Sequence, residues 1–173
     1  KIDGTNGVIY IGVDGEFLAG SHCRWLTPES DNFGFAKWVI KNKEELLKLG
    51  VGFHYGEWWG NGIQRNYGLK EKRFSLFNSG RWIKDKNILL LDKQEYCPAC
   101  CDVVPILYTG IFDTNISGSF IDYLHFNGSK AAPGFMKPEG IVIYHRASNT
   151  MFKKTIENDE VPKTTIKSGT EFR

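Results

Sequence analysis

The sequence lacks any apolar run long enough to cross a membrane, and its first residues do not resemble a signal peptide. It also lacks a strong charge imbalance, because 22 lysines and arginines stand against 20 aspartates and glutamates, for a formal net charge of +2. A charge this small does not identify a nucleic-acid-binding protein, so any basic groove must come from local clustering. We therefore expect a cytoplasmic protein, located in the host cytoplasm if the source is a virus.

Cysteine is scarce and poorly placed for disulfide bonds. Of the four cysteines, Cys97, Cys100 and Cys101 lie together, whereas Cys23 lies far away in the sequence. This layout does not fit a disulfide framework, and we expect reduced thiols. A zinc site is disfavoured as well, because a structural site needs four ligands in paired spacing and only Cys23 and His125 are candidates at a distance.

The length of 173 residues and the hydrophobic fraction of 41% are those of an ordinary globular domain. We expect one domain over residues 1–156. Residues 157–173 are polar and contain Pro162 within a mixture of Lys, Thr, Ser and Gly, which indicates a tail or a linker. The sequence starts at Lys1 without an initiator methionine, so we expect a fragment, a processed chain or a chain whose upstream residues were not retained.

Apolar patterns predict many short strands with two helices inserted among them. Apolar runs at residues 8–13 and 17–18 flank Asp14-Gly15, a pair typical of β-hairpin turns. Helical spacing predicts helices over residues 35–49 and near 118–126. Further strands are expected at 51–59, 74–77, 88–91, 103–108, 140–145 and 151–156. This order predicts an α+β fold with largely antiparallel sheets.

Four short motifs follow one another along the chain. They are Lys1-Ile2-Asp3-Gly4-Thr5-Asn6, Tyr55-Gly56-Glu57-Trp58, Glu139-Gly140-Ile141-Val142 and Phe152-Lys153-Lys154. Their order resembles that of the covalent nucleotidyl transferases, a superfamily of DNA ligases, RNA ligases and mRNA capping enzymes. DNA ligases and capping enzymes usually carry Arg two residues after the motif's glycine. The ending Gly4-Thr5-Asn6 is instead similar to RNA ligases of the bacteriophage and trypanosome-editing type, as is the run from Arg24 to Glu29.

This resemblance implies an ATP-dependent RNA ligase with an ATP-grasp-like nucleotidyl-transferase domain, acting as a monomer. Lys1 would attack the α-phosphorus of ATP to form a lysyl-AMP intermediate and expel pyrophosphate. The AMP would then pass to the 5′-phosphate of an RNA end, which a 3′-hydroxyl attacks. Only a neutral amine attacks, whereas an ordinary lysine is protonated at neutral pH. Lys153, Lys154 and a bound Mg²⁺ or Mn²⁺ would disfavour a further positive charge at the nucleophile.

The resemblance also assigns roles to residues far from Lys1. Glu57 would accept hydrogen bonds from the ribose hydroxyls, and Glu139, which precedes an apolar strand, would bind the metal ion. Gly4 would let the backbone pass close to the nucleotide, and Asn6 would bond its ribose or phosphate. The nucleotide site would comprise Lys1, Ile2, Gly4, Asn6, Arg24, Glu57, Phe77, Glu139 and Lys153, with catalysis by Lys1, Glu139 and Lys153.

Adenine needs an aromatic platform. The segment Phe74-Ser75-Leu76-Phe77-Asn78 resembles the family's Phe-Asp strand, with Asn78 where Asp is usual. Phe77 is the preferred stacking residue and Phe74 the second, and a place in the core is about equally expected for each of them.

The last motif has adjacent lysines, where the superfamily usually separates them by one residue. In an extended strand Lys153 and Lys154 should therefore point to opposite faces. We expect Lys153 to reach the α-phosphate, while Lys154 is a candidate RNA-backbone contact or a solvated charge. Arg24 suits a phosphate bidentately and would contact the 5′-phosphate of RNA or the AMP phosphate.

Two other functions fit the same residues. A DNA ligase or a GTP-using capping enzyme would share the lysine chemistry, and a degenerate, non-catalytic RNA-binding module would keep the fold without it. Relatives commonly have a further carboxy-terminal domain and an upstream strand that helps to hold adenine. Nicked, duplex and single-stranded RNA all remain open as substrates.

Overall fold

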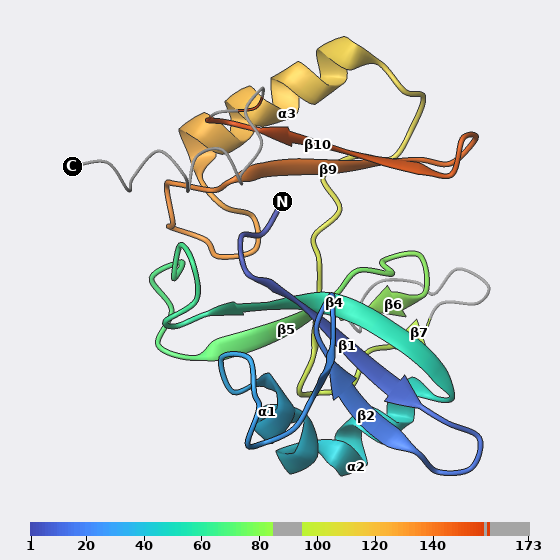
Figure 1. Ribbon diagram of the computed structural model, residues 1–173. Helices are drawn as coiled ribbons and strands as arrows, with labels where there is room; N and C mark the ends of the chain where they lie inside the picture. Colours follow the sequence, from blue (N-terminus) through green and yellow to red (C-terminus); the bar gives the residue numbers. More distant parts are fainter. Residues whose placement is uncertain (85–94, 158, 160–173) are drawn as a thin grey trace. The chain divides into compact units, whose positions relative to one another are not determined.

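A computed structural model describes residues 1–84, 95–157 and 159 (Figure 1). The chain divides into two compact units: unit 1 comprises Lys1–Ile2 and Leu107–Arg173, and unit 2 comprises Asp3–Ile106. Three α-helices and mostly antiparallel strands make up the described part, which confirms the predicted α+β class. The strand predicted at 88–91 and nearly all of the polar tail lie outside the described residues.

Unit 2 is built on a six-stranded sheet with the order β3-β2-β1-β4-β5-β8. Its strands are β1 (Thr5–Ile11), β2 (Phe17–Gly20), β3 (Trp25–Leu26), β4 (Gly52–Gly60), β5 (Lys72–Leu76) and β8 (Asp102–Val103). Every pairing in it is antiparallel except that of β5 with β8. The predicted hairpin is confirmed, with Gly15 at a φ of +88° in the turn between β1 and β2.

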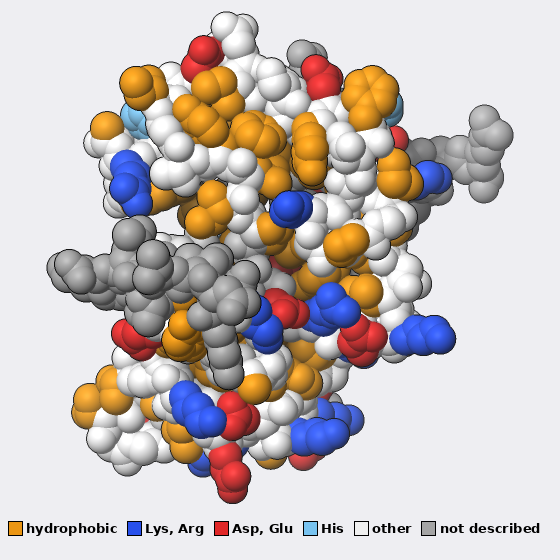
Figure 2. Space-filling view, turned by 180° about the vertical axis from the view of Figure 1, so that it is seen from behind, with side chains coloured by type: hydrophobic (Ala, Val, Ile, Leu, Met, Phe, Trp, Pro, Cys, Tyr) orange, Lys and Arg blue, Asp and Glu red, His pale blue; other side chains and the backbone are white. Residues whose placement is uncertain are grey.

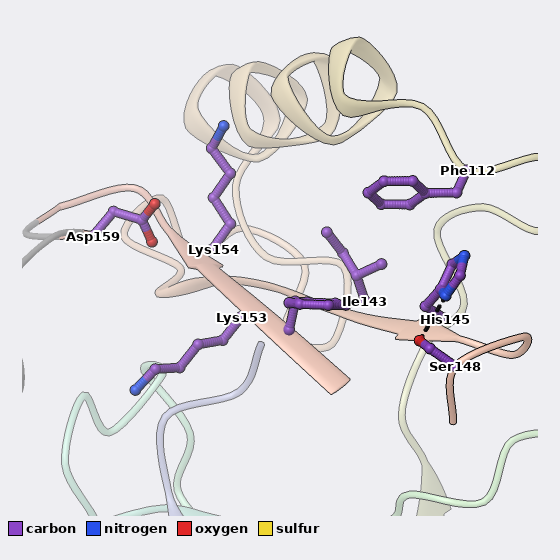
Figure 3. A pocket seen from close by; sticks show the side chains of 8 residues that line it. Phe112, Ile143, His145, Ser148, Lys153, Lys154 and Asp159 are labelled. Atoms are coloured by element: carbon purple, nitrogen blue, oxygen red, sulfur yellow. Dashed lines mark hydrogen bonds between the residues drawn. The ribbon is translucent and has the colours of Figure 1, made fainter. Parts of the chain in front are cut away.

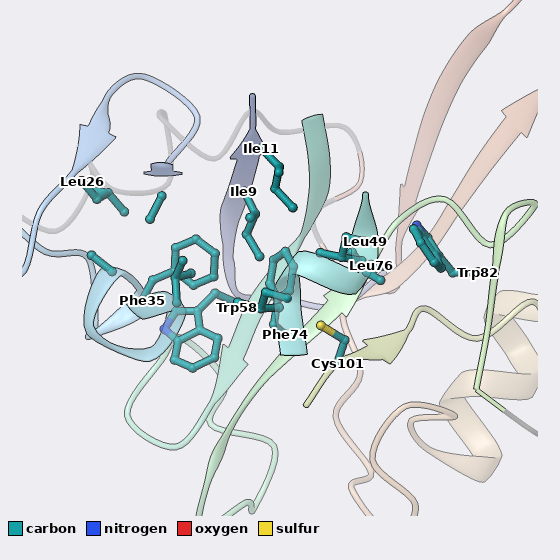
Figure 4. Close-up of a cluster of buried hydrophobic side chains, with 14 of the residues drawn as sticks. Ile9, Ile11, Leu26, Phe35, Leu49, Trp58, Phe74, Leu76, Trp82 and Cys101 are labelled. Atoms are coloured by element: carbon teal, nitrogen blue, oxygen red, sulfur yellow. The ribbon is translucent and has the colours of Figure 1, made fainter. Parts of the chain in front are cut away.

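Side chains on one face of this sheet form the hydrophobic core with α1 (Phe35–Lys41), α2 (Lys43–Leu46) and the 3-10 helix η1 (Leu47–Leu49) (Figure 4). Because side chains alternate along a strand, Trp58 and Phe74 point into this core from neighbouring strands. The core also contains Ile9, Ile11, Ala19, Leu26, Phe35, Ala36, Val39, Leu46, Leu49, Ile63, Leu76, Trp82 and Cys101.

The single helix predicted over residues 35–49 is in fact divided at Asn42. This residue has φ −105° and ψ 17°, outside the helical range, and its side-chain amide donates a hydrogen bond to the Trp38 carbonyl at 2.8 Å. Backbone hydrogen bonds nevertheless continue across this residue, since the Asn42 amide donates to the Trp38 carbonyl at 3.1 Å and the Leu46 amide donates to the Asn42 carbonyl at 2.9 Å. Gly50, with a φ of +79°, ends the segment where the sequence predicts an end.

Several short strands differ from the prediction. The run predicted as a strand at 103–108 pairs only over Asp102–Val103, since Pro105 has no amide hydrogen with which to continue the ladder. Three elements were not predicted: β3, β6 (Trp82–Ile83) and β7 (Glu95–Tyr96), of which the last two form a small parallel sheet. Each of these strands has two residues, too few to show the alternation of apolar and polar residues that identifies a strand in a sequence.

Unit 1 consists of the helix α3 (Thr114–Asn127) and the antiparallel hairpin of β9 (Gly140–His145) and β10 (Thr150–Thr155). The helix begins earlier than predicted, because the Asp113 side chain caps it by accepting a hydrogen bond from the Asn115 amide at 2.8 Å. Leu124 is its only buried residue, and hydrophobic side chains of this unit stand exposed in several groups (Figure 2).

Among the described residues, no helix has the length and apolar character needed to span a bilayer.

Burial of His54 predicts that the stability of unit 2 depends on pH. It lies on the core-facing side of β4 at 4% exposure, with Nε2 2.8 Å from the Gly50 carbonyl oxygen. Burial lowers the pKa of His54 below its ordinary value of 6.5. As the pH falls, the unfolded chain therefore binds a proton before the folded chain does. The free energy of unfolding should decrease as the pH is lowered through the ordinary histidine range.

Urea unfolding at neutral and mildly acidic pH measures this dependence. His54→Gln keeps an amide donor for Gly50 but cannot titrate, so the difference in unfolding free energy between the two pH values should shrink. His22→Gln changes an exposed histidine and serves as the control. An unchanged pH dependence in His54→Gln would contradict the assignment.

Candidate active site

The face of the unit 2 sheet opposite the helices carries polar side chains from three neighbouring strands. Glu57 on β4 pairs in register with Asn6 on β1 and with Ser75 on β5, so the three side chains point to the same side. Glu57 is only 9% exposed. A carboxylate so buried needs hydrogen-bond donors, and the Gly4 amide donates one to its Oε1 at 2.9 Å.

The segment that leads into β1 is held by a loop that sequence reasoning missed. The Asp3 amide donates to the Tyr67 hydroxyl at 2.7 Å, and the Asp3 carboxylate accepts a hydrogen bond from Arg65 Nε at 3.1 Å. The loop backbone takes the left-handed conformation at Gln64, Asn66 and Tyr67, with φ between 45° and 62°. Its asparagines and glycines are a turn signal, but they do not reveal what the loop contacts.

Gly4 lies where the chain passes directly over β4. A Cβ atom at this position would lie 2.5 Å from the Trp58 carbonyl oxygen and 2.7 Å from the Trp59 Cβ, closer than such atoms approach. The approach seen here is therefore to the protein backbone, whereas the sequence predicts an approach to nucleotide. The next residue, Thr5, accepts a hydrogen bond from the Asn32 side-chain amide at 2.9 Å.

Within unit 1, the first and third motifs meet. The Lys1 side-chain ammonium forms an ion pair with Glu139, and the Lys1 backbone nitrogen donates to the Gly140 carbonyl. The side chains are 20% and 3% exposed, so this is a largely buried pair. Residues 138 apart in the sequence are thus brought into contact, and Lys1 is not a solvated side chain.

The comparison with protein families decides what kind of protein carries these contacts. The family model described as RNA ligase matches residues 1–156, a stretch that contains all four motifs and ends just after β10. The chain belongs to the RNA ligase family. None of the curated proteins compared with it gives a match.

In this RNA ligase, the adjacent lysines of β10 point to opposite faces of the hairpin, as strand geometry predicts. Lys153 pairs in register with Val142, and Lys154 with Ile141. Figure 3 shows the Lys154 side chain directed toward α3 and the Lys153 side chain directed the other way. Lys153 is exposed and Lys154 is half-buried. The two ammonium groups therefore leave the strand in opposite directions.

A cavity of about 580 Å³ lies beside this hairpin (Figure 3). Phe112, Ile143 and Phe152 give it apolar walls, and both lysines of β10 contribute to its lining. The His145 ring lies edge-on to Phe112 with centroids 5.5 Å apart. The Asp159 carboxylate also lines the cavity, so its polar part carries both signs of charge.

The two phenylalanines considered for adenine stacking differ sharply. Phe74 is fully buried, with its ring centroid 5.1 Å from that of Phe35 and 5.7 Å from that of Trp38, so it is a core residue. Phe77 is 42% exposed, and its amide donates to the Tyr55 carbonyl at 2.9 Å. Of this pair, Phe77 alone has a ring surface accessible to a base.

The Arg24 guanidinium is held by the loop that follows it. Its Nη1 donates to the carbonyl and to the hydroxyl of Ser30, both at 2.8 Å, and its Nη2 donates to the Asp31 carbonyl at 3.3 Å. The residue is nevertheless exposed. The loop thus fixes a positive charge at the surface next to β3.

Three of the four cysteines of this RNA ligase, Cys97, Cys100 and Cys101, lie next to the core of unit 2 or within it. All four cysteines are free thiols, as predicted. The Cys100 and Cys101 sulfurs lie 4.0 Å apart, and that contact together with burial raises the pKa of the Cys101 thiol. In the part of the chain that the structure describes, no three His, Cys, Asp or Glu side chains cluster as metal ligands would.

Proposed function

We propose that this RNA ligase domain uses ATP and forms a lysyl-AMP intermediate at Lys1. The observation that carries the proposal is the buried pairing of Lys1 with Glu139, because it puts a nucleophile and an acidic group in one place within unit 1. The resemblance of the motifs to bacteriophage and trypanosome-editing RNA ligases supports ATP use, and so does the ATP-grasp-like nucleotidyl-transferase fold that the resemblance implies.

In the first step, Lys1 Nζ forms a bond to the α-phosphorus of ATP. The bond from that phosphorus to the bridging oxygen breaks, and pyrophosphate leaves with the electron pair. The amine must lose a proton beforehand, since an ammonium group has no lone pair with which to attack. Because Lys1 Nζ is paired with Glu139 in the structure, this contact would open before the attack.

A divalent cation gives Glu139 an alternative partner. Mg²⁺ is commonly held by one or two carboxylates together with substrate phosphates and waters, so the single buried carboxylate of Glu139 fits it. A bound Mg²⁺ or Mn²⁺ would neutralise charge on the phosphates. While holding the cation, the Glu139 carboxylate would no longer pair with the Lys1 amine.

The polar face of unit 2 is the proposed site for the nucleoside. Glu57 would accept hydrogen bonds from the ribose hydroxyls, with Asn6 beside it in register. Phe77 would stack on adenine, as its exposed ring permits. Arg24, fixed on its loop, would contact the 5′-phosphate of the RNA end.

Two further steps complete the reaction. An oxygen of the 5′-phosphate attacks the lysyl-AMP phosphorus, the phosphorus–nitrogen bond breaks as the nitrogen takes up a proton from solvent, and Lys1 regains its amine. The 3′-hydroxyl of the second RNA end then attacks the activated 5′-phosphate, loses its proton and releases AMP. All steps build charge on phosphate oxygens, which preorganised cations such as Lys153 stabilise.

Intact-mass spectrometry of the protein after incubation with ATP and Mg²⁺ tests the proposal directly. We expect a gain of one AMP with ATP and no comparable gain with GTP, and then transfer to 5′-phosphorylated RNA in preference to DNA. Absence of any covalent adduct, with RNA binding retained, would favour a non-catalytic RNA-binding module. A GMP adduct, or transfer to nicked DNA, would favour the capping-enzyme or DNA-ligase alternative.

The adjacent lysines should differ in their effect on adduct formation. Lys153→Ala is expected to slow it about 100-fold, because an aligned cation near the α-phosphate is lost, whereas Lys154→Ala should slow it less than about tenfold. Quenched-flow measurement of adduct formation gives both rates, with exposed Lys130→Ala as the control. A larger loss in Lys154→Ala would reverse the assignment.

A further inference from the structure

Four aromatic rings form a partly exposed surface on the unit 2 sheet. They are Tyr10 on β1, Trp25 on β3, and Phe53 and Tyr55 on β4, and we refer to them as the aromatic platform. The Tyr10 and Phe53 centroids lie 4.6 Å apart, those of Phe53 and Tyr55 6.1 Å, and those of Trp25 and Phe53 6.4 Å. Rings at these separations make one continuous surface.

The exposure of the platform sets it apart from the core. Trp25 is 49% exposed, and Phe53 and Tyr55 are each 53% exposed, whereas Trp58 and Phe74 in the same sheet are 2% exposed or less. The Phe53 ring plane makes angles of only 14° with Tyr55 and 24° with Trp25, so the three rings share a common tilt. Contiguous exposed aromatic surface of this kind marks a binding site.

The position of the platform indicates its ligand. Side chains alternate along β4, so Phe53 and Tyr55 lie on the same face as Glu57, and each step of two residues spans about 6.8 Å. The platform therefore continues the face proposed to hold the nucleoside.

Exposed aromatic rings on an open sheet suit a single-stranded nucleic acid, because its unpaired bases have free faces that can stack on the rings. In a duplex the faces of the bases are already covered by their neighbours. We propose that the aromatic platform binds unpaired bases of single-stranded RNA next to the end that is joined. This inference rests on RNA being the substrate of the proposed reaction, and it makes that substrate single-stranded.

Fluorescence anisotropy of a labelled single-stranded RNA, titrated with the complete chain, tests the inference. Trp25→Ala and Phe53→Ala should each weaken binding about 5- to 100-fold, the loss expected when one base stack is removed. Phe53→Tyr keeps a ring and should bind like the wild type, whereas Phe53→Leu keeps only apolar bulk and should bind like Phe53→Ala. The matched control is Phe126→Ala, a 74% exposed ring on α3.

An abasic RNA of the same length separates stacking from charge and from folding. The wild type should prefer the RNA with bases to the abasic RNA about 5- to 100-fold. Phe53→Ala should lose most of this preference while its affinity for the abasic RNA stays unchanged. A variant damaged in its fold would instead bind both RNAs more weakly.

Three results would overturn the inference: equal wild-type affinity for RNA with and without bases, undiminished base preference in Phe53→Ala, or a change only in the oligomeric state of the platform variants. The last result would identify a second copy of the chain as the occupant. Formation of the covalent AMP adduct by the wild type is measured in parallel. If the wild type forms the adduct but shows no preference for RNA with bases over abasic RNA, only the role of the aromatic platform is contradicted. If it shows this preference but forms no adduct, only the proposed lysyl-AMP chemistry is contradicted.

Discussion

Lys1→Ala is expected to lose the covalent AMP adduct completely, a decrease of more than about 10³-fold, because no other atom takes over bond formation when a covalent nucleophile is removed. Intact-mass spectra of wild type and variant after ATP treatment measure the effect. The alanine variant also removes the cation that Glu139 contacts, and breaking a largely buried ion pair costs about 3–5 kcal/mol of stability. A loss of activity could then reflect a loss of fold.

Lys1→Arg resolves this ambiguity. The guanidinium keeps a positive charge for Glu139, so the fold should persist, but it does not give up a proton in proteins and cannot act as the nucleophile. We expect a thermal transition close to that of the wild type and no adduct. An adduct that survives in both variants, mapped by peptide analysis to another lysine, would refute the role of Lys1.

Glu139→Gln is expected to slow adduct formation at least about 100-fold, since the loss of several kcal/mol of metal-dependent charge stabilisation corresponds to at least two orders of magnitude in rate. The amide keeps the size of the side chain but loses the negative charge that suits a hard cation. Adduct formation is followed as a function of Mg²⁺ concentration. The variant should require more Mg²⁺ than the wild type and recover part of its rate when Mg²⁺ is raised.

Glu157→Gln provides the matched control, because it makes the same change at an exposed position of unit 1. It should leave both the rate and the Mg²⁺ requirement unchanged. If Glu139→Gln slowed the reaction without altering the Mg²⁺ requirement, Glu139 would act only by positioning Lys1. A wild-type rate in Glu139→Gln would remove this residue from the mechanism.

The sequence predicts those parts of the fold that have a visible local signal. Asp14-Gly15 between apolar runs identifies the first hairpin, and Gly50 and Gly128 mark the ends of helical segments. Asn42 and Glu45 fit an internal capping box in the sequence, but the Asn42 side chain makes no capping bond and donates instead to the Trp38 carbonyl. The two-residue strands carry no periodic signal, since their pairing depends on neighbours distant in the sequence.

The candidate site is predicted in its components but not in its contacts. The order of the motifs nominates Glu139, but the pairing with Lys1 spans 138 residues and follows only from the fold. Phe74 and Phe77 are the same residue type in one short segment, so the sequence does not tell which of them is buried. The structure does, because the Phe74 ring packs against Trp38 while the Phe77 ring is exposed. Arg65, which holds the first motif through Asp3, carries no signal beyond its charge.

Side chains along β4 point alternately to the two faces of the sheet, so a change in the number of residues in this strand disturbs the fold far more than most single substitutions in it. One face of the strand is buried against the helices and the other carries Glu57, so inserting a single residue ahead of Gly56 would shift the pairing of one half of the strand by one position. Either Glu57 would turn into the core and Trp58 out of it, or Phe53 and Tyr55 would change sides. Related ligases should therefore conserve the number of residues in this strand even where the residues differ, and should vary in length at the turn around Gly15.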